Sequence, residues 1–457
     1  MEELALEQMR ETSEVKTLIV GLGKTGLSCA RYLAARGVSA AITDSRDQPP
    51  GLAALKSELP DTALFLGKFD PQVFEAAEQL VVSPGVAVSE PLIQAAIARG
   101  VPVIGDIELF AREAKAPVAA ITGSNGKSTV TTLLAEMAEI DGCRVAVGGN
   151  LGEPALDLLD PAVELYVLEL SSFQLETTHT LAPAASVVLN LSADHLDRYA
   201  GIDAYAEAKA RIYHHAVGRV FNLDDSRVMV MQGAEGGGLL FTLGVPEAGC
   251  FGVDYREGGA WLCCGEQGLL PVSELKIPGR HNVANALAAL AMGSLLKLSM
   301  EAMLTALQRF PGLPHRTRFV AESGNIRWYN DSKGTNVGAC IAALEGMRSD
   351  QGADRTVLIA GGEGKGADFS PLAAVVAATA RVVILIGRDA PQIAQALEGT
   401  VPLLHAESME EAVALAARQA QSGDRVLLSP ACASFDMFRD YRQRGDRFTD
   451  AVRRLLQ

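Results

Sequence analysis

The chain has 457 residues, which predicts about two to four domains. Its 48% hydrophobic and 21% charged residues are typical of a folded globular protein and exclude disorder, collagen and coiled coil as the main state. The net charge of −15 repels polyphosphate backbones, so the composition argues against a nucleic-acid partner.

The first part of the chain alternates between strands and helices. An acidic start without an uncharged apolar run predicts no secretory signal. The alternation predicts βαβ units around a parallel sheet. We expect strands over Lys16–Val20, Val38–Thr43, Ala63–Leu66, Gln79–Val82 and Val101–Ile104, and helices over Ser28–Arg36 and Pro91–Arg99.

A second unit of the same kind starts at Pro117. Short β-rich runs split by glycines between Arg219 and Cys264 predict an antiparallel insert. The longest uncharged stretch, Asn282–Leu296, is too short and too polar to span a membrane. Strands are expected over Pro117–Ile121, Leu165–Leu170 and Ala185–Asn190, and helices over Ser128–Ile140 and Asn282–Lys297.

A third α/β unit follows a predicted hinge at Gly312–Arg316. Helices separate its strands, as in the first two units. We expect breaks between units near Gly105–Pro117 and Gly312–Pro314. The strands are expected over Ile326–Asn330, Thr356–Ile359, Arg381–Ile386 and Arg425–Ser429.

The first glycine-rich turn contains Gly21, Gly23 and Gly26. It follows a strand and opens a helix, where glycines allow a diphosphate to approach and the helix N-terminus favours an anion. Asp44 ends the next strand, where a ribose-binding acid is expected. The motif fits NAD, FAD or another nucleotide diphosphate such as UDP, and it also fits a βα turn without a ligand.

The second glycine-rich turn, TGSNGKST at Thr122–Thr129, is the stronger signal. Its backbone N–H groups can hold phosphates, and Lys127 can neutralise their charge. A hydroxyl of Ser128 or Thr129 can bind Mg²⁺. Gly123 lies closer to Gly126 than in the usual P-loop pattern, so the motif is a variant.

Glu169 and His195 follow neighbouring predicted strands, which brings both to the carboxyl edge of one sheet. Carboxylate, imidazole and phosphate oxygens together suit Mg²⁺. Zinc is disfavoured because no third His or Cys stands at ligand spacing. His195 alone also fits an ordinary surface or core histidine, and Lys209, in a helical stretch, is expected on a solvated face.

Together these residues resemble the Mur ligase family over essentially the whole chain. TGSNGKST and Asp194–His195 are general to the family, whereas GLGKTGLS, NDSKGTN, GGEGKGADF and SPACASFD resemble the members that add D-glutamate. Further matching segments are VVSPGV, GGNLGEPAL, LELSSFQLETT, NLSADHLDRY, IPGRHNVANALAAL and GLPHRTRF.

The resemblance implies an α/β protein with three domains. Residues 1–105 would be a Rossmann-like domain that binds a UDP-substrate. Residues 106–312 would be the central P-loop ATPase domain, with a parallel sheet plus a small antiparallel β part. Residues 313–457 would be a Rossmann-like, amino-acid-binding domain.

The resemblance also implies an ATP-dependent amide ligase of peptidoglycan precursor synthesis. The L-alanine carboxylate of UDP-N-acetylmuramoyl-L-alanine would take the γ-phosphate of ATP, and the amine of D-glutamate would then attack the acyl phosphate. ATP and Mg²⁺ are the expected cofactors. Seven scattered cysteines without a CxxC pair favour a reducing cytoplasm, and we expect a monomer with no nucleic-acid or membrane partner.

Carried over residue by residue, the resemblance assigns four groups of functional residues. Catalysis would use Lys127, Glu169, His195 and Lys209. The metal ligands would be Ser128, Glu169, His195 and Lys209, the last as a carbamate. ATP would be bound by Gly123, Ser124, Asn125, Gly126, Lys127, Ser128, Thr129, Asn282, Asn285, His315, Arg316 and Asp331.

The substrate residues are implied in the same way. The UDP-substrate would be bound by Lys24, Thr25, Asp44, Ser45, Arg46, Asn150, Ser171 and His195. D-glutamate or the acyl phosphate would be bound by Lys333, Thr335, Lys365, Ser434, Phe435 and Tyr441. Because the ATP residues come from two domains, we expect the domains to approach each other for chemistry.

Simpler roles remain open for several of these residues. Asn282 and Asn285 could cap the helix they open. Lys365 could be a loop solubiliser, and Ser434 could cap a helix. His315 and Arg316 could be hinge residues only.

Other functions also remain open. A nicotinamide dehydrogenase would explain the first glycine turn, but it leaves the second turn, Glu169 and His195 without a role. A ligase for another amino acid and a non-catalytic nucleotide-binding regulator are further alternatives.

Overall fold

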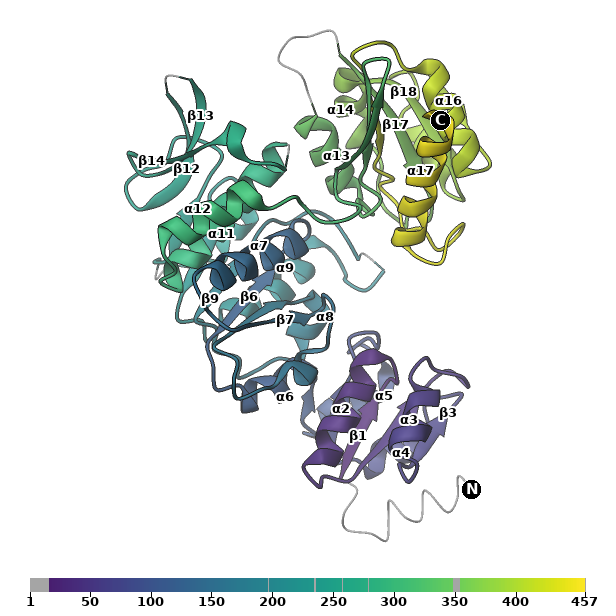
Figure 1. Ribbon diagram of the computed structural model, residues 1–457. Coiled ribbons are helices and arrows are strands. Elements are labelled where there is room, and N and C mark those ends of the chain that lie inside the picture. Colours follow the sequence, from purple (N-terminus) through teal and green to yellow (C-terminus); the bar gives the residue numbers. More distant parts are fainter. Residues whose placement is uncertain are drawn as a thin grey trace.

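The computed structural model describes residues 16–195, 197–233, 236–256, 258–277, 279–347 and 354–456. The acidic start of the chain, where no secretory signal is predicted, lies outside these residues. Three α/β bodies follow one another along the chain, each around its own sheet, with the central body between the other two (Figure 1). Within the described ranges, no helix is long and apolar enough to cross a membrane.

The first body contains a parallel five-stranded sheet of order β3-β2-β1-β4-β5. The strand order reverses beside β1, and such a reversal opens a crevice at the carboxyl ends of the strands. Helix α2 begins earlier than predicted, because Gly23 is its N-cap. The elements are β1 (Thr17–Val20), α2 (Lys24–Ala35), β2 (Ala40–Asp44), α3 (Leu52–Glu58), β3 (Leu64–Leu66), α4 (Pro71–Ala76), β4 (Gln79–Val82), α5 (Pro91–Ala98) and β5 (Val103–Ile104).

The central body contains a nine-stranded sheet of order β14-β13-β12-β11-β10-β9-β6-β8-β7. Its first half comprises α6 (Asp106–Glu113), β6 (Val118–Thr122), α7 (Lys127–Ile140), β7 (Val145–Gly149), η1 (Ala155–Leu158), β8 (Leu165–Glu169), α8 (Ser172–Glu176), β9 (Ala185–Val188), α9 (Ile202–Ala210) and η2 (Arg211–Tyr213). Its second half comprises β10 (Arg219–Asn222), α10 (Ser226–Val230), β11 (Leu239–Phe241), β12 (Cys250–Arg256), β13 (Gly259–Cys264), β14 (Gln267–Pro271), η3 (Val272–Glu274), α11 (Arg280–Leu295) and α12 (Met300–Arg309).

The predicted antiparallel insert over Arg219–Cys264 is wrong for its first half. Strands β10 and β11 are parallel to β9 and extend the main sheet, and only β12, β13 and β14 form antiparallel pairs. The side chains of Val220 and Phe221 are buried in the cores on opposite faces. Burial on both faces is typical of a parallel strand, and glycine-rich connections do not reveal it.

The third body has a six-stranded sheet of order β15-β16-β20-β17-β18-β19, parallel except for the β15–β16 hairpin. Separate apolar clusters fill its two faces. The elements are β15 (Arg318–Ser323), β16 (Ile326–Asn330), α13 (Val337–Gly346), β17 (Thr356–Gly361), α14 (Leu372–Thr379), β18 (Ala380–Ile386), α15 (Ala390–Ala396), β19 (Leu403–His405), α16 (Met409–Gln419), β20 (Arg425–Leu428) and α17 (Tyr441–Leu456).

The first and central bodies share an apolar core. Leu27 and Leu33 of α2 belong to the same buried cluster as Phe110 of α6 and Leu168 of β8. The ring of Phe110 meets the ring of Tyr166 edge to face, with centroids 5.0 Å apart. Because α6 packs on both bodies, the boundary expected at residue 105 stays a prediction.

Candidate active site

The loops of the candidate site leave the carboxyl ends of three neighbouring strands, β9, β6 and β8. The loop after β6 leads into α7 through Gly126, which is the N-cap of that helix and has a φ of 84°. A Cβ at Gly126 would overlap the amide of Asn285, and one at Gly123 would lie 3.0 Å from Leu189 Cβ. The glycines of the second turn are therefore required by close packing as well as by backbone conformation.

Lys127 is the first residue of α7, and its side chain folds back over the loop. Its Nζ donates to the carbonyl oxygens of Gly123 at 2.8 Å and Ser124 at 2.9 Å. Burial lowers the pKa of Lys127, although the nearby carboxylates of Glu169 and Asp194 act in the opposite direction. An ammonium group held in this way lies where a bound phosphate would meet the loop.

Glu169 is the last residue of β8 and is 4% exposed. Ser128 Oγ donates to its Oε2 at 2.6 Å, and Asn150 Nδ2 donates to its Oε1 at 2.9 Å. Arg316, from the segment that leads into the third body, donates from Nη2 to Ser128 Oγ at 2.7 Å. Burial acts to raise the pKa of Glu169, but Lys127 and these hydrogen bonds outweigh it, so the pKa is lowered and the carboxylate stays ionised.

His195 lies on the loop after β9, at the rim of the site, with a φ of 54°. Its Nε2 is 3.9 Å from Asp194 Oδ2, and its ring packs edge to face on Phe173 with centroids 4.9 Å apart. Burial lowers the pKa of His195, while Asp194 acts to raise it. The imidazole is therefore biased toward its neutral form, which can accept a hydrogen bond or bind a cation.

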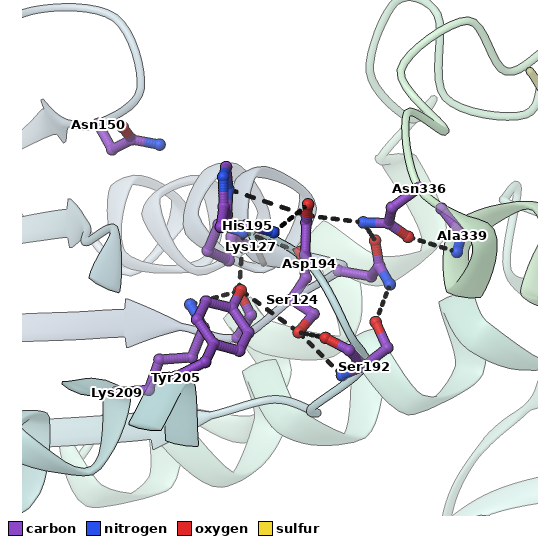
Figure 2. Close-up of polar contacts among 12 residues, drawn as sticks. Ser124, Lys127, Asn150, Ser192, Asp194, His195, Tyr205, Lys209, Asn336 and Ala339 are labelled. Carbon is purple, nitrogen blue, oxygen red and sulfur yellow. Dashed lines mark hydrogen bonds and ion pairs between the residues drawn. The ribbon is translucent and has the colours of Figure 1, made fainter. Parts of the chain in front are cut away.

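Lys209 does not lie on a solvated face, so that interpretation is wrong. The side chain is 1% exposed, and its Nζ donates to Gly123 O at 3.0 Å and Thr122 Oγ1 at 3.2 Å. It also lies 4.6 Å from the ring centroid of Tyr205 (Figure 2). Burial lowers the pKa of Lys209 well below its usual value, and Lys127 acts in the same direction. The helical spacing could not reveal this, because it does not show that α9 packs under the loop.

Three of the cavities around these residues contain most of the predicted site residues. The first-sheet cavity, of about 530 Å³, lies at the carboxyl ends of β1, β2 and β4. The α11 cavity, of about 320 Å³, lies between α11, the β6–α7 loop and α13. The central cavity, also of about 320 Å³, lies between them and adjoins both, because Asn150 borders it and the first-sheet cavity while Arg316 borders it and the α11 cavity.

Most of the predicted site residues line these cavities. The first-sheet cavity is lined by Lys24, Thr25, Asp44, Ser45, Arg46 and Asn150. The α11 cavity is lined by Asn125, Gly126, Thr129, Asn282, Asn285, Arg316 and Asp331. The central cavity is lined by Ser124, Lys127, Ser128, Glu169, Ser171, His195, Lys209, Lys333, Thr335, Lys365, Ser434, Phe435 and Tyr441. Residues far apart in the sequence therefore converge in space, and their functional roles stay predictions.

The comparisons with known proteins agree with this geometry. Residues 15–105 match the family description "Mur ligase MurD-like, N-terminal domain", residues 121–293 match "Mur ligase middle domain", and residues 315–432 match "Mur ligase, glutamate ligase domain". The chain belongs to the Mur ligase family.

Two relatives of this Mur ligase carry the name UDP-N-acetylmuramoylalanine--D-glutamate ligase. The relative from Nitrosococcus oceani is 56% identical, over 98% of this chain and 99% of its own. The relative from Marinobacter nauticus is 52% identical, over 96% of this chain and 98% of its own. Both alignments cover the first-sheet, central and third-body residues together.

Solved structures share the fold at low sequence identity. The UDP-N-acetylmuramate-alanine ligase MurC of Thermotoga maritima has a TM-score of 0.59 at 19% identity, covering 96% of this chain and 99% of that one. MurF of Acinetobacter baumannii has a TM-score of 0.58 at 16% identity, covering 98% of each chain. The three-part α/β architecture is therefore that of a Mur ligase.

His315 of this Mur ligase lies against α17, although the resemblance implies that it reaches ATP. Its Nδ1 is 3.1 Å from Asn330 Nδ2, and its Nε2 is 3.6 Å from Asp446 Oδ1. A Cβ at Gly445 would overlap the ring of His315, so the contact with α17 is close. Its role toward ATP stays a prediction.

The capping alternative for Asn282 and Asn285 is wrong, because Gly279 is the N-cap of α11. Both asparagines lie further along the helix, and Asn285 Nδ2 donates to Asn282 Oδ1 at 3.2 Å. The hinge alternative is likewise insufficient for Arg316, since its guanidinium contacts Ser128 across two bodies.

Several residues of the site were missed by reasoning from the sequence. Phe173, Tyr205 and Asn336 line the central cavity, and Ser83 lines the first-sheet cavity. Ser83 directly follows β4, so its position at the end of a strand could have indicated it. Asn336 and Tyr205 offer no such signal, because their contacts are distant in the sequence: Asn336 contacts Asp194, and Tyr205 contacts Ser124.

Arg444 of α17 was also missed, although it joins two loops that border the central cavity. It is buried, and its guanidinium donates to Ser332 O at 2.7 Å, Cys432 O at 3.0 Å and Ala433 O at 3.2 Å. Burial lowers the pKa of Arg444 to about 10. This arginine therefore joins the two loops that carry Lys333 and Ser434. Its place in the sequence offers no signal, because α17 contains several other arginines.

The first glycine turn gives a testable prediction of stability. Asp44 Oδ2 accepts a hydrogen bond from Leu22 N at 2.7 Å, and a Cβ at Gly26 would overlap the carbonyl oxygen of Gly21. We expect Gly26→Ala to lower the free energy of unfolding by about 2 kcal/mol, because backbone must shift. Urea unfolding measures this change. Gly23→Ala is the matched control, since nothing lies within 4 Å of its added Cβ, and an equal loss in both variants would contradict the prediction.

Proposed function

We propose that this Mur ligase adds D-glutamate to UDP-N-acetylmuramoyl-L-alanine, using ATP, in peptidoglycan precursor biosynthesis. The observation that carries the proposal is the central cavity, which gathers the phosphate loop, Glu169, His195 and the predicted D-glutamate residues around one space. The names of the relatives, at 52% to 56% identity over nearly the whole chain, support the same activity.

Two of the cavities match substrates by chemistry, and the third joins them. The first-sheet cavity would hold the UDP part of the substrate, because its crevice lies at a switch point beside the first glycine turn. The α11 cavity would hold ATP, since it borders the phosphate loop and offers the amides of Asn282 and Asn285 to a base. The central cavity lies between them, where the γ-phosphate and the L-alanine carboxylate would meet.

The charge of the central cavity favours anionic reactants. Three of its basic residues are Lys127, Arg316 and Lys333, and burial lowers the pKa of Lys333 to about 8. Lys365 is a further cation, and the acidic residues of the cavity are Glu169, Asp194 and Asp440. The cations of this cavity suit phosphate and carboxylate groups, despite the net charge of −15 of the whole chain.

The proposed reaction has two steps. The L-alanine carboxylate attacks the γ-phosphorus of ATP, and the bond to ADP breaks as an acyl phosphate forms. The amine of D-glutamate then attacks the acyl carbon, phosphate leaves, and an amide bond results. Lys127 and Arg316 would neutralise charge on the transferred phosphoryl group and hold it in place, which is most of what phosphoryl transfer requires.

Part of a Mg²⁺ site is present, because Ser128 Oγ and Glu169 Oε2 are hard oxygen ligands 2.6 Å apart. Among the residues that the structure describes, no group of three or more His, Cys, Asp and Glu side chains could hold a metal ion, so phosphate oxygens would complete the set of ligands. Ser128, Glu169 and His195 would hold the ion, together with Lys209 as a carbamate. When bound, Mg²⁺ would supply further neutralisation of the phosphate charge.

Carbamylation of Lys209 is a prediction with a physical basis. The lowered pKa of Lys209 leaves more of the neutral amine, which adds to CO₂ and loses a proton to give an anionic carbamate. We expect Lys209→Met to lower kcat by roughly 10²- to 10³-fold, since a charge at the reacting centre is lost. Enzyme in ¹³C-bicarbonate should show a carbamate carbon signal that this variant lacks. Lys276→Met, at an exposed position, is the control, and a carbamate signal that persists in Lys209→Met would contradict the assignment.

Phosphate release tests the proposed function. The enzyme is given ATP, Mg²⁺ and UDP-N-acetylmuramoyl-L-alanine, with D-glutamate added, withheld, or replaced by L-glutamate, L-lysine or meso-diaminopimelate. We expect release only with D-glutamate and a product heavier by one glutamyl residue. Release with another amino acid alone would overturn the substrate, and no release from protein that binds ATP would favour a non-catalytic regulator.

The proposal also covers the cellular location, the oligomeric state and the domain bounds of the enzyme. All seven cysteines are free thiols, which fits a reducing cytoplasm. We propose a cytoplasmic monomer with domains at residues 1–105, 106–312 and 313–457.

A further inference from the structure

The start of α13 docks against the central body beside the phosphate loop. Asn336 is the N-cap of α13, and its Oδ1 accepts a hydrogen bond from Ala339 N at 2.8 Å. The residue is 8% exposed and borders the central cavity. A Cβ at Gly338, the second residue of the helix, would lie 2.8 Å from Ser192 Oγ, so the two bodies meet closely here.

The amide nitrogen of Asn336 reaches across this contact to two residues. It donates to Asp194 Oδ2 at 3.1 Å (Figure 2). It also donates to Asn125 Oδ1 at 3.3 Å. An amide offers two donors on nitrogen and an acceptor oxygen, so one side chain both caps α13 and makes both contacts. Ser would keep an acceptor for the cap but lose the second donor, and Asp would place a carboxylate against Asp194.

The two partners of Asn336 belong to the reacting machinery of the central body. Asn125 N donates to Asn190 Oδ1 at 2.9 Å, and Asn125 Nδ2 donates to Ser192 Oγ at 3.3 Å, so this residue joins the phosphate loop to the loop after β9. Asp194 Oδ1 accepts a hydrogen bond from His195 N at 2.9 Å. Asn336 therefore contacts both the phosphate loop and the loop after β9.

We propose that Asn336 is a positioning residue that fixes the phosphate loop and the Asp194–His195 pair when the third body is docked. The inference rests on the proposed function for its catalytic consequence. The docked amide sets the Asn125 side chain and one oxygen of Asp194, so the reacting groups are ordered only while α13 lies against them. The order of the phosphate loop would therefore depend on whether the third body, which carries the predicted D-glutamate residues, is docked.

The test compares Asn336→Ser with the wild type. Ser is a good N-cap, so the melting temperature should be retained. We expect kcat of D-glutamate-dependent phosphate release to fall by roughly 10- to 100-fold, while the dissociation constant of UDP-N-acetylmuramoyl-L-alanine stays unchanged. A wild-type kcat in Asn336→Ser would overturn the inference.

Two controls separate positioning from capping. Asn336→Ala should lower both the melting temperature and kcat. Ser408→Ala removes the N-cap of α16, which accepts from Glu411 N, and should lower the melting temperature without lowering kcat. If Asn336→Ser lowers kcat only together with the melting temperature, as Asn336→Ala should, then Asn336 acts only as a helix cap and the inference is wrong.

A double-mutant cycle with Asn125→Ala tests whether Asn336 acts through the phosphate loop. We expect the combined variant to lose less activity than the product of the two single losses. Independent, multiplying losses would overturn the inference.

Hydrogen exchange gives a readout that needs no turnover. We expect amides of 122–129 and 190–195 to exchange faster in Asn336→Ser than in the wild type, with no change in β17. If the wild type shows no D-glutamate-dependent phosphate release, the proposed function is wrong. Equal hydrogen exchange in the wild type and in Asn336→Ser would overturn the positioning role, whatever the function.

Discussion

Replacing Lys127 with methionine is expected to lower kcat by about 10³-fold, because the ammonium group that neutralises the transferred phosphoryl group is lost. Methionine keeps the apolar length of the side chain in its half-buried position. The hydrogen bonds from Nζ to Gly123 O and Ser124 O are lost as well, so the loop loses both a charge and a restraint. Single-turnover phosphate release measures the effect on the chemical step.

The dissociation constant of UDP-N-acetylmuramoyl-L-alanine should change little in Lys127→Met, since the first-sheet cavity does not include this residue. Lys115→Met is the matched control, because Lys115 is exposed before β6 and should leave kcat unaltered. A kcat within about threefold of the wild type would contradict the assigned role, since so small a factor is under 1 kcal/mol of activation free energy.

Replacing Glu169 with glutamine is expected to lower kcat by roughly 10²- to 10³-fold and to raise the Mg²⁺ concentration needed for half-maximal activity. The change removes the anion that Lys127 and Arg316 face. It also places an amide beside Asn150 Nδ2 or Ser128 Oγ, each of which now donates to a carboxylate oxygen. Titration of activity with Mg²⁺ measures the second effect.

The pH dependence of Glu169→Gln has a defined sign. A carboxylate whose folded pKa is lowered adds stability above its unfolded pKa, and that stability is lost as the pH falls through the folded pKa. The lowered pKa of Glu169 therefore predicts that the wild type loses this stability in acid, whereas Glu169→Gln has none to lose. Melting temperatures between pH 7 and pH 3 compare the two.

Glu164→Gln is the control for both measurements. Glu164 stands just before β8 and pairs with Arg144 on the surface, at 3.1 Å between Oε1 and Nη2. It should leave kcat and the Mg²⁺ requirement unchanged. An unchanged Mg²⁺ requirement in Glu169→Gln would remove Glu169 from the set of proposed metal ligands.

Much of the candidate site could be predicted because it lies on a parallel sheet. The glycine turn after β6, Glu169 at the end of β8 and the loop after β9 all share the carboxyl edge. Strand runs separated by helices are visible in a sequence, and parallel strands bring the ends of those runs together. The order of these strands in the sheet, β9-β6-β8, could not be predicted, because it depends on which strands form hydrogen bonds with each other.

The prediction failed where the environment of a residue comes from another part of the chain. Helical spacing favoured an exposed Lys209, but α9 packs beneath the β6–α7 loop and buries it. Glycine-rich connections favoured an antiparallel insert, but helices cover both faces of β10. Periodicity reports only the polarity of a segment's own faces, so it cannot tell which other segment covers them.

We could derive from the residue order the alternation of strands and helices, the two glycine turns and the chemistry available at the strand ends, since each depends on residues close together in the chain. Only the folded chain shows that Arg316 contacts Ser128, that Asn336 contacts Asp194, and that Arg444 joins two loops. The contacts of Arg316 and Asn336 join residues more than a hundred positions apart and depend on how the central and third bodies dock, whereas Arg444 joins two loops within the third body. No local pattern encodes such docking, because its free energy comes from surfaces that exist only after each body has folded.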